Sequence, residues 1–315
     1  MDYAYHFSLP CHLYGCGVTA AVLDTGIVNH PDFDHRILAF KDFVNGNTVM
    51  YDDNGHGTHV AGILGGSGAL SKRRCRGIAP AVKLVSLKVL DHNGNGSLKQ
   101  VLKALDWLLE HYKKYGVRIV NISIGTLPDR DTEEGSDLMR KIDALWDENL
   151  CIFAAAGNAG PQRGSVTSPG IHRKIITVGC CEPFPVIEQG KKVRMRYSGR
   201  GPVQHSCVMK PEVVAYGKDI ISCNYRFAER QKPYVQKSGT SMAAPMAAGS
   251  AALLLEKYPH LTNNQVKLCF RESCLDLGLP VNQQGWGLIQ PEQLVKAGAT
   301  QPAIPIVHRE PPVVR

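Results

Sequence analysis

The sequence predicts an α/β protein with a doubly wound, mainly parallel β-sheet flanked by helices. Apolar segments rich in strand-forming residues alternate with segments of helical periodicity, which is typical of βαβ units. The apolar segments are hydrophobic almost without interruption, as expected of strands covered on both faces. The composition, with 43% hydrophobic and 20% charged residues among 315, suits a globular core.

The strands and helices of this fold can be placed from local patterns. Continuous apolar character predicts strands over residues 19–25, 83–90, 118–124, 151–157, 175–180 and 211–217. Amphipathic spacing predicts helices over residues 97–116, 136–150 and 262–274, and capping boxes open the first and the last of these. Further helices are expected to start near His56 and to occupy residues 238–259, where alanines allow close packing.

The chain is expected to form a single domain over residues 1–300. Residues 182–210 are charged and rich in Pro and Gly, so we expect them to leave the core as an excursion. Residues 301–315 are proline-rich and predict an extended or disordered tail. No internal repeat is present.

Composition argues against several classes of partner. The net charge of +8 is spread along the chain, and its densest basic cluster, residues 71–76, fits a solvated loop, so no nucleic-acid partner is expected. No apolar run reaches the ~18 residues that cross a bilayer, so no membrane partner is expected either. Nothing in the sequence indicates an oligomeric state.

The ten cysteines indicate a compartment. There is no Cys-x-x-Cys spacing, and Cys180 and Cys181 are adjacent, which suits neither a common disulfide nor zinc. We therefore expect mostly reduced thiols and a cytoplasmic protein. The polar start of the chain does not resemble a signal peptide. Export by a non-classical route or after processing is the alternative.

Four polar residues lie at or near the ends of predicted elements. Asp24 ends an apolar strand and is either a turn-forming residue or a functional acid. His56 and His59 lie in a glycine-rich segment, where they could bind zinc, or one could be a catalytic base and the other a core residue. The glutamate of HExxH is missing. Asn158 follows another strand and is either a turn residue or an amide donor for developing negative charge.

Ser241 stands at the start of the helix predicted over residues 238–259. Its hydroxyl could cap this helix. Pro245 has no N–H, so the Ser241 carbonyl lacks its helical partner, and several alanines follow in the same turn. This arrangement favours a buried helix that presents a nucleophile to a cleft.

The four segments together resemble the signature blocks of the subtilisin-like serine proteases, or subtilases. They are "AAVLDTGI", "NGHGTHVAG", "AAAGNAGP" and "SGTSMAAP", and the similarity extends from about residue 17 to about residue 292. The resemblance implies a serine endopeptidase in which Ser241 attacks, His56 is the general base and Asp24 orients it. It implies that Asn158 and the Ser241 amide bind the oxyanion, and that His59 is structural.

The resemblance also implies a cleft that binds protein or peptide substrates as an extended strand. Ser123, Ile124 and Gly125 would line one side of the pocket for the residue before the cut, with a wall of Ala155, Ala156 and Gly157 opposite and Thr167 shortening the base. The second edge would comprise Leu90, Asn93, Gly94, Asn95 and Gly96. Because these stretches include no carboxylate apart from Asp91 on the rim, we expect a neutral or apolar residue before the cut.

No cofactor is expected to be required, and no metal is expected at the catalytic residues. The segment after "HGTHVAG" lacks the Asn-rich insertion that carries a tight calcium site in secreted subtilases, which leaves only weaker calcium sites open. Two other functions compete. One is a metallohydrolase that uses Asp24, His56 and His59, and the other is a non-catalytic binding protein with a protease fold. A Gly-x-Gly-x-x-Ala match at residues 15–20 precedes its strand, so it does not indicate dinucleotide binding.

Overall fold

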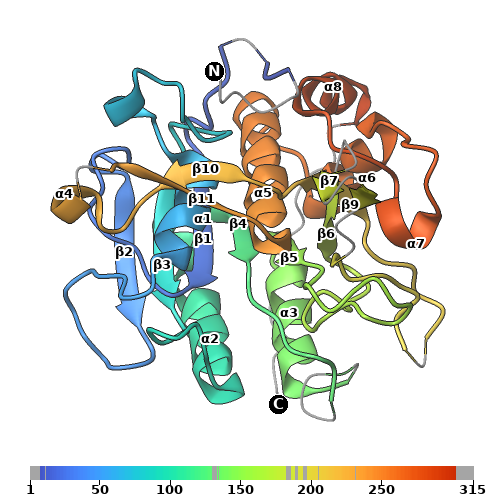
Figure 1. The fold of residues 1–315 in the computed structure, drawn as a ribbon, viewed down its shortest axis with the longest axis horizontal. Coiled ribbons are helices and arrows are strands. Elements are labelled where there is room, and N and C mark those ends of the chain that lie inside the picture. The colour runs from blue at the N-terminus through green and yellow to red at the C-terminus, as the bar shows by residue number, and fades with distance from the viewer. Residues whose placement is uncertain are drawn as a thin grey trace, which may run out of the picture.

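A seven-stranded sheet runs through the middle of the molecule, and all of its neighbouring strands are parallel (Figure 1). The computed structural model describes residues 8–302 except for residues 11, 130–132, 134, 182–185, 189–190, 194–196, 205 and 231. The strand order is β2-β3-β1-β4-β5-β6-β9. The strands are β1 (Thr19–Asp24), β2 (Ile37–Asp42), β3 (Lys83–Lys88), β4 (Val117–Ile122), β5 (Cys151–Ala155), β6 (Ile176–Cys181) and β9 (Val213–Tyr216).

Helices cover both faces of this sheet. One face packs against α1 (His56–Gly65) and α5 (Thr240–Lys257), and the other against α2 (Leu98–Tyr115) and α3 (Asp137–Asp147). The remaining helical segments are α4 (Phe227–Arg230), α6 (Asn263–Ser273), α7 (Val281–Gln284), α8 (Pro291–Ala297), η1 (Ala69–Ser71) and η2 (Gly298–Thr300). Two antiparallel hairpins complete the described fold: β7 (Val186–Glu188) with β8 (Lys191–Val193), and β10 (Ile220–Cys223) with β11 (Tyr234–Lys237).

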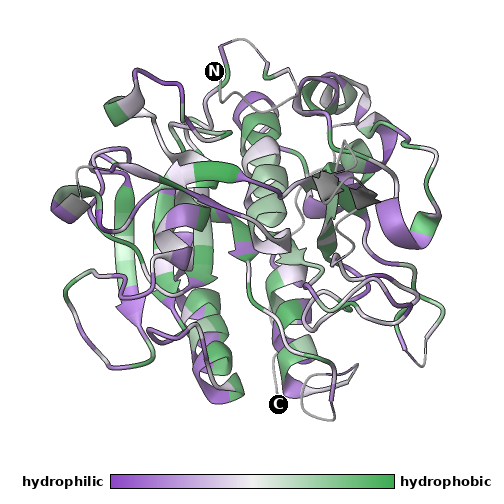
Figure 2. Ribbon diagram, in the orientation of Figure 1, coloured by the Kyte–Doolittle hydropathy of each residue, from purple (hydrophilic) through white to green (hydrophobic). Residues whose placement is uncertain are grey.

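The two-sided cover explains the continuous hydrophobicity of the strands. In β1, Ala20 and Val22 join the core under α1 and α5, while Ala21 and Leu23 join the core under α2 and α3. Side chains alternate between the faces of a strand, so both parities must be apolar when both faces are buried. In Figure 2 the central strands are accordingly mostly green, and the surrounding loops carry much of the purple.

Helix α5 lies in the centre of the molecule because its residues are small. From Met242 to Leu255 every residue is buried, and the helix contacts five strands as well as α1. A Cβ at Gly249 would lie only 2.7 Å from the Cβ of Ile78. A larger residue would therefore push α5 away from α1 and from the segment between α1 and β3.

The predicted α/β class is confirmed, and the predicted segments agree with the observed elements to within about three residues at each end. The sequence did not reveal β2 or the β10–β11 hairpin. β2 lies at the sheet edge and is only partly buried, so its apolar pattern is weak. None of the described residues within 182–210 joins the central sheet. Residues 303–315 of the predicted tail lie outside the described residues, and the single-domain assignment stays a prediction. Among the described helices, none is long and apolar enough to cross a bilayer.

Candidate active site

A cleft of about 680 Å³ opens at the carboxyl end of the central sheet. Its lining includes residues that follow β1, β3, β4 and β5, together with the first residues of α1 and α5. Parallel strands bring their carboxyl ends to one edge, which is where α/β proteins place their sites. The fold thus brings together segments that are separated by up to about 220 residues in the sequence.

Asp24 and His56 form a hydrogen-bonded pair beside this cleft. The Asp24 Oδ1 atom lies 2.7 Å from His56 Nδ1 and also accepts the Thr25 N–H at 2.7 Å. Asp24 is buried, whereas a quarter of the His56 side chain is exposed. Burial alone lowers the pKa of His56, but the charge and hydrogen bond of Asp24 outweigh it, so the pKa lies above its usual value. Asp24 therefore stabilises the protonated ring of His56 beside the cleft.

The loop before His56 is held by the buried carboxylate of Asp52. That carboxylate accepts bonds from the Thr25 hydroxyl, from the Thr58 hydroxyl and from the backbone N–H groups of residues 54, 55 and 58. Gly57 must be glycine, because a Cβ there would lie 2.2 Å from the Gly26 carbonyl oxygen. The close approach of these two backbones sets His56 against Asp24.

Ser241 lies in the first turn of α5, but its hydroxyl does not cap the helix. Gly239 is the N-cap and has no side chain with which to bond the first N–H groups of the helix. The Ser241 hydroxyl instead donates to the Ser123 carbonyl oxygen at 3.0 Å, and the Ser123 hydroxyl donates to the Ser241 carbonyl oxygen at 3.2 Å. Because Pro245 has no N–H, this carbonyl would otherwise lack a partner.

Asn158 is oriented by the start of the same helix. Its Oδ1 accepts the backbone N–H and the hydroxyl of Thr240, each at 3.1 Å. The amide oxygen is thereby occupied, and the Nδ2 group is left to donate. Gly239 keeps space beside it, because a Cβ there would lie 3.3 Å from Nδ2. Asn158, His56 and Ser241 all line the cleft.

Most of the predicted substrate-binding residues line this cleft as well. They are Leu90, Asn93, Gly94, Asn95, Gly96, Ser123, Ile124, Gly125, Ala155, Gly157 and Thr167. Ala156 does not line it: this residue is buried, and its backbone bonds Val178 and Thr167. The cleft also includes Leu98, Val101 and Leu138, which the sequence analysis did not single out. These residues belong to amphipathic helices, where an apolar residue at the helix start is indistinguishable from a core residue.

His59 does not face the cleft. It is completely buried, and its Nε2 lies 3.1 Å from the Ile220 carbonyl oxygen and 3.0 Å from that of Val235. Burial, with the positive charges of Lys237 and His56, lowers its pKa to about 3, so it stays neutral. Its ring ties α1 to the β10–β11 hairpin, and it is not placed to share a metal with Asp24 and His56.

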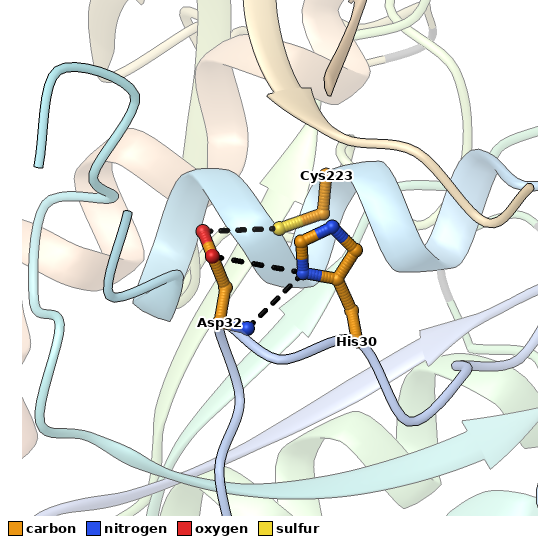
Figure 3. Close-up of side chains that lie close together, drawn as sticks. All are labelled: His30, Asp32 and Cys223. Atoms are coloured by element: carbon orange, nitrogen blue, oxygen red, sulfur yellow. Dashed lines mark hydrogen bonds and ion pairs between the residues drawn. The ribbon is translucent and has the colours of Figure 1, made fainter. Parts of the chain in front are cut away.

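The described residues contain one cluster with metal-ligand chemistry, formed by His30, Asp32 and Cys223 (Figure 3). Each group already has partners: His30 Nδ1 accepts the Asp32 N–H, and the Asp32 carboxylate accepts the Gly68 N–H and the hydroxyl of Tyr234. Burial and the negative charge of Asp32 raise the pKa of Cys223 well above its usual value. The Cys223 thiol donates to Asp32 Oδ2 at 3.7 Å, so the three side chains link the segment between β1 and β2 to β10.

Comparison with known proteins identifies the family of the chain. Residues 15–287 match the sequence profile of peptidase S8, the Subtilase family. The chain belongs to the subtilase family. It is 39% identical to the serine protease AprX of Bacillus subtilis (strain 168) over 268 residues, which cover 81% of this chain and 60% of AprX. It is 31% identical to subtilisin Savinase of Lederbergia lenta over 281 residues, 89% of this chain and 91% of Savinase.

Solved subtilase structures share the fold. Sphericase superposes with a TM-score of 0.74 and 27% identity, covering 90% of this chain and 94% of its own. A cold-adapted subtilisin-like serine proteinase gives a TM-score of 0.71 and 28% identity, covering 92% of this chain and 96% of its own. The similarity in fold therefore covers at least nine tenths of this chain.

The raised pKa of His56 predicts the acid side of the pH profile. A general base must be neutral, so kcat/KM should fall as the pH drops through a value above 6.5, the usual pKa of histidine. Asp24→Asn removes the charge that raises this pKa, so the limb should move to lower pH and the rate should fall by about 10⁴-fold. Rate–pH profiles of the two proteins check this. An unmoved limb would contradict the role given to Asp24.

Proposed function

We propose that this chain is a serine endopeptidase that uses Asp24, His56 and Ser241. The observation that carries the proposal is the Asp24–His56 hydrogen bond, formed at 2.7 Å in the same cleft that presents Ser241. A serine hydroxyl attacks amides only when a neighbouring base removes its proton. Membership of the subtilase family supports the assignment.

The reaction begins when the Ser241 hydroxyl leaves the Ser123 carbonyl oxygen and donates to His56 Nε2. His56 takes the proton as Ser241 Oγ bonds to the substrate carbonyl carbon, and it then protonates the departing amine. Asp24 holds Nδ1–H and stabilises the imidazolium. Water next attacks the acyl group by the same route in reverse, which regenerates the Ser241 hydroxyl.

The negative charge that forms on the substrate oxygen is met by two donors, the Asn158 Nδ2 group and the Ser241 backbone N–H. Thr240 holds the Asn158 amide before the substrate arrives, so little reorganisation is needed. A donor of this kind typically accelerates turnover by about 10²–10³-fold. The helix dipole of α5 adds a positive potential at the same place.

Labelling with a fluorophosphonate tests the assignment of the nucleophile. Such reagents react with activated serines, so the native protein should be labelled and Ser241→Ala should not. Ser250→Ala is the matched control, because Ser250 lies in the same helix and its hydroxyl only donates to the Met246 carbonyl oxygen. Equal labelling of native protein and Ser241→Ala would falsify the assignment.

The proposed substrates are proteins or peptides that lie extended between two edges of the cleft. Ser123, Ile124 and Gly125 line one edge, and the segment from Leu90 to Gly96 lines the other. Backbone pairing of this kind gives affinity without demanding a particular sequence, and side-chain pockets then give specificity.

Thr167 limits the pocket for the residue before the cut. Its Oγ1 is buried without a partner among the described residues. The same atom would lie 2.4 Å from a Cβ at Gly125 and 2.3 Å from a Cβ at Gly157, so it packs directly against both glycines. The threonine therefore fills the gap between the two glycine walls. We propose that the enzyme prefers neutral, small residues before the cut.

Paired substitutions at Thr167 separate its size from its hydroxyl. Thr167→Ala should raise kcat/KM for substrates with Leu or Phe before the cut by about tenfold or more, because it deepens the pocket. Thr167→Val keeps the volume, so its preference should match the native enzyme. Its free energy of unfolding should rise by about 1 kcal/mol, because a methyl replaces an unpartnered hydroxyl. Peptide-library profiling and thermal melts measure both. A native preference for Arg or Lys would refute this pocket assignment.

No cofactor is required in the proposed mechanism, since every step uses side chains or backbone groups of this chain. Incubation with a chelator should therefore leave the activity of freshly prepared enzyme within about twofold of its starting value. Loss of activity in the chelator, restored by zinc but not by calcium, would favour the metallohydrolase alternative. Restoration by calcium alone would reveal a structural ion site.

The proposed location is the cytoplasm. The nine cysteines that the structure describes are all free thiols. Free thiols persist in a reducing compartment, which supports this location.

A further inference from the structure

Lys88 is a buried cation that the proposed mechanism does not use. It ends β3, its side chain is completely buried, and in the sheet register it lies beside Asp24 on one side and Asp42 on the other. Burial of an ammonium group costs several kcal/mol unless hydrogen bonds replace its water. A lysine at such a position therefore requires a reason beyond packing.

The three donors of the Lys88 ammonium group are all used. Nζ donates to the Thr25 carbonyl oxygen at 2.7 Å, to Asp53 Oδ1 at 2.7 Å and to the Leu90 carbonyl oxygen at 2.8 Å. It also lies 4.9 Å from the centre of the Tyr51 ring. An ammonium group has three N–H bonds, so this set is complete.

The three acceptors belong to the three segments that must meet for the reaction. Thr25 follows the catalytic Asp24, Asp53 lies in the loop that leads to His56, and Leu90 begins the substrate edge. A second link joins the last two segments, because Asn54 donates to the His92 carbonyl oxygen at 2.9 Å. One cation thus fixes the edge relative to the Asp24–His56 pair.

We propose that Lys88 is a positioning residue that aligns the edge from Leu90 to Gly96 with Asp24 and His56, so that an extended peptide reaches Ser241 in register. The inference rests on the proposed endopeptidase function. Its consequence depends on substrate length: a peptide that fills the edge benefits from the alignment, and a single-residue ester does not. A displacement of about 1 Å can cost about 10²-fold in rate.

The test compares a tetrapeptide anilide with a single-residue ester, each with Ala before the cut. Lys88→Met should lower kcat/KM for the anilide about 10- to 100-fold more than for the ester, mainly through KM. Active-site titration corrects both values for the fraction of folded enzyme. A general loss of stability lowers kcat/KM for both substrates by the same factor, so the ratio between the two values stays unchanged.

Lys210→Met is the matched control. Lys210 is also completely buried, and its Nζ donates to Glu212 at 2.6 Å and to the Ile175 carbonyl oxygen at 3.2 Å, but it does not line the cleft. Burial lowers the pKa of Lys210 to about 8, so its charged form is less favourable than that of an exposed lysine. Its substitution should change stability but not the ratio between the two substrates.

If Lys88→Met does not fold, Asp53→Ala provides a second test. The Asp53 side chain is 34% exposed, so its removal is tolerated better, and it takes away one of the three acceptors. The ratio should then shift in the same direction by a smaller factor. An unchanged ratio in the folded variants overturns the role of Lys88. A native protein inactive on both substrates and unlabelled at Ser241 overturns the proposed function instead.

Discussion

The site depends on one hydrogen bond, between the buried carboxylate of Asp24 and the partly exposed ring of His56. The second Asp24 oxygen is buried with no partner among the described residues. A carboxylate in such surroundings is poorly compensated while His56 is neutral, and it gains a full counter-charge when the ring takes a proton. The same burial that makes Asp24 costly to fold therefore makes the imidazolium favourable during the reaction.

Around this pair, side chains bond backbone groups that have no partner within the regular helices and strands. Pro245 removes the helical partner of the Ser241 carbonyl, and the Ser123 hydroxyl replaces it. The return bond from Ser241 to Ser123 keeps the nucleophile pointing into the cleft at the joint between β4 and α5. The nucleophile is thus held by a defect in the helix, which a fully regular helix would not provide.

How much the sequence could predict follows from the range of each interaction. The central strands were predictable because burial on both faces requires an uninterrupted run of apolar residues in each of them. The four site residues were predictable because they lie in motifs similar to those of a known family. Lys88 and Asp52 were not predictable, because a charged residue beside an apolar strand ordinarily indicates an exposed end. Asp52 bonds Thr25, 27 residues away, and Lys88 bonds Asp53 and Thr25, 35 and 63 residues away, so only the folded chain shows that their charges are buried.

Several buried polar groups gather near this cleft, namely Asp24, Asp52, His59 and Lys88, and others, such as Asp32 and Lys210, are buried elsewhere in the molecule. Apolar replacements of similar volume are often more stable than buried charges. Near the cleft these groups set a direction that packing alone cannot set: a dispersion contact tolerates a shift of half an ångström, but an ammonium group with three fixed acceptors does not. The fold gives up some stability at the carboxyl edge of the sheet and obtains a defined orientation of His56, Ser241 and the substrate edge.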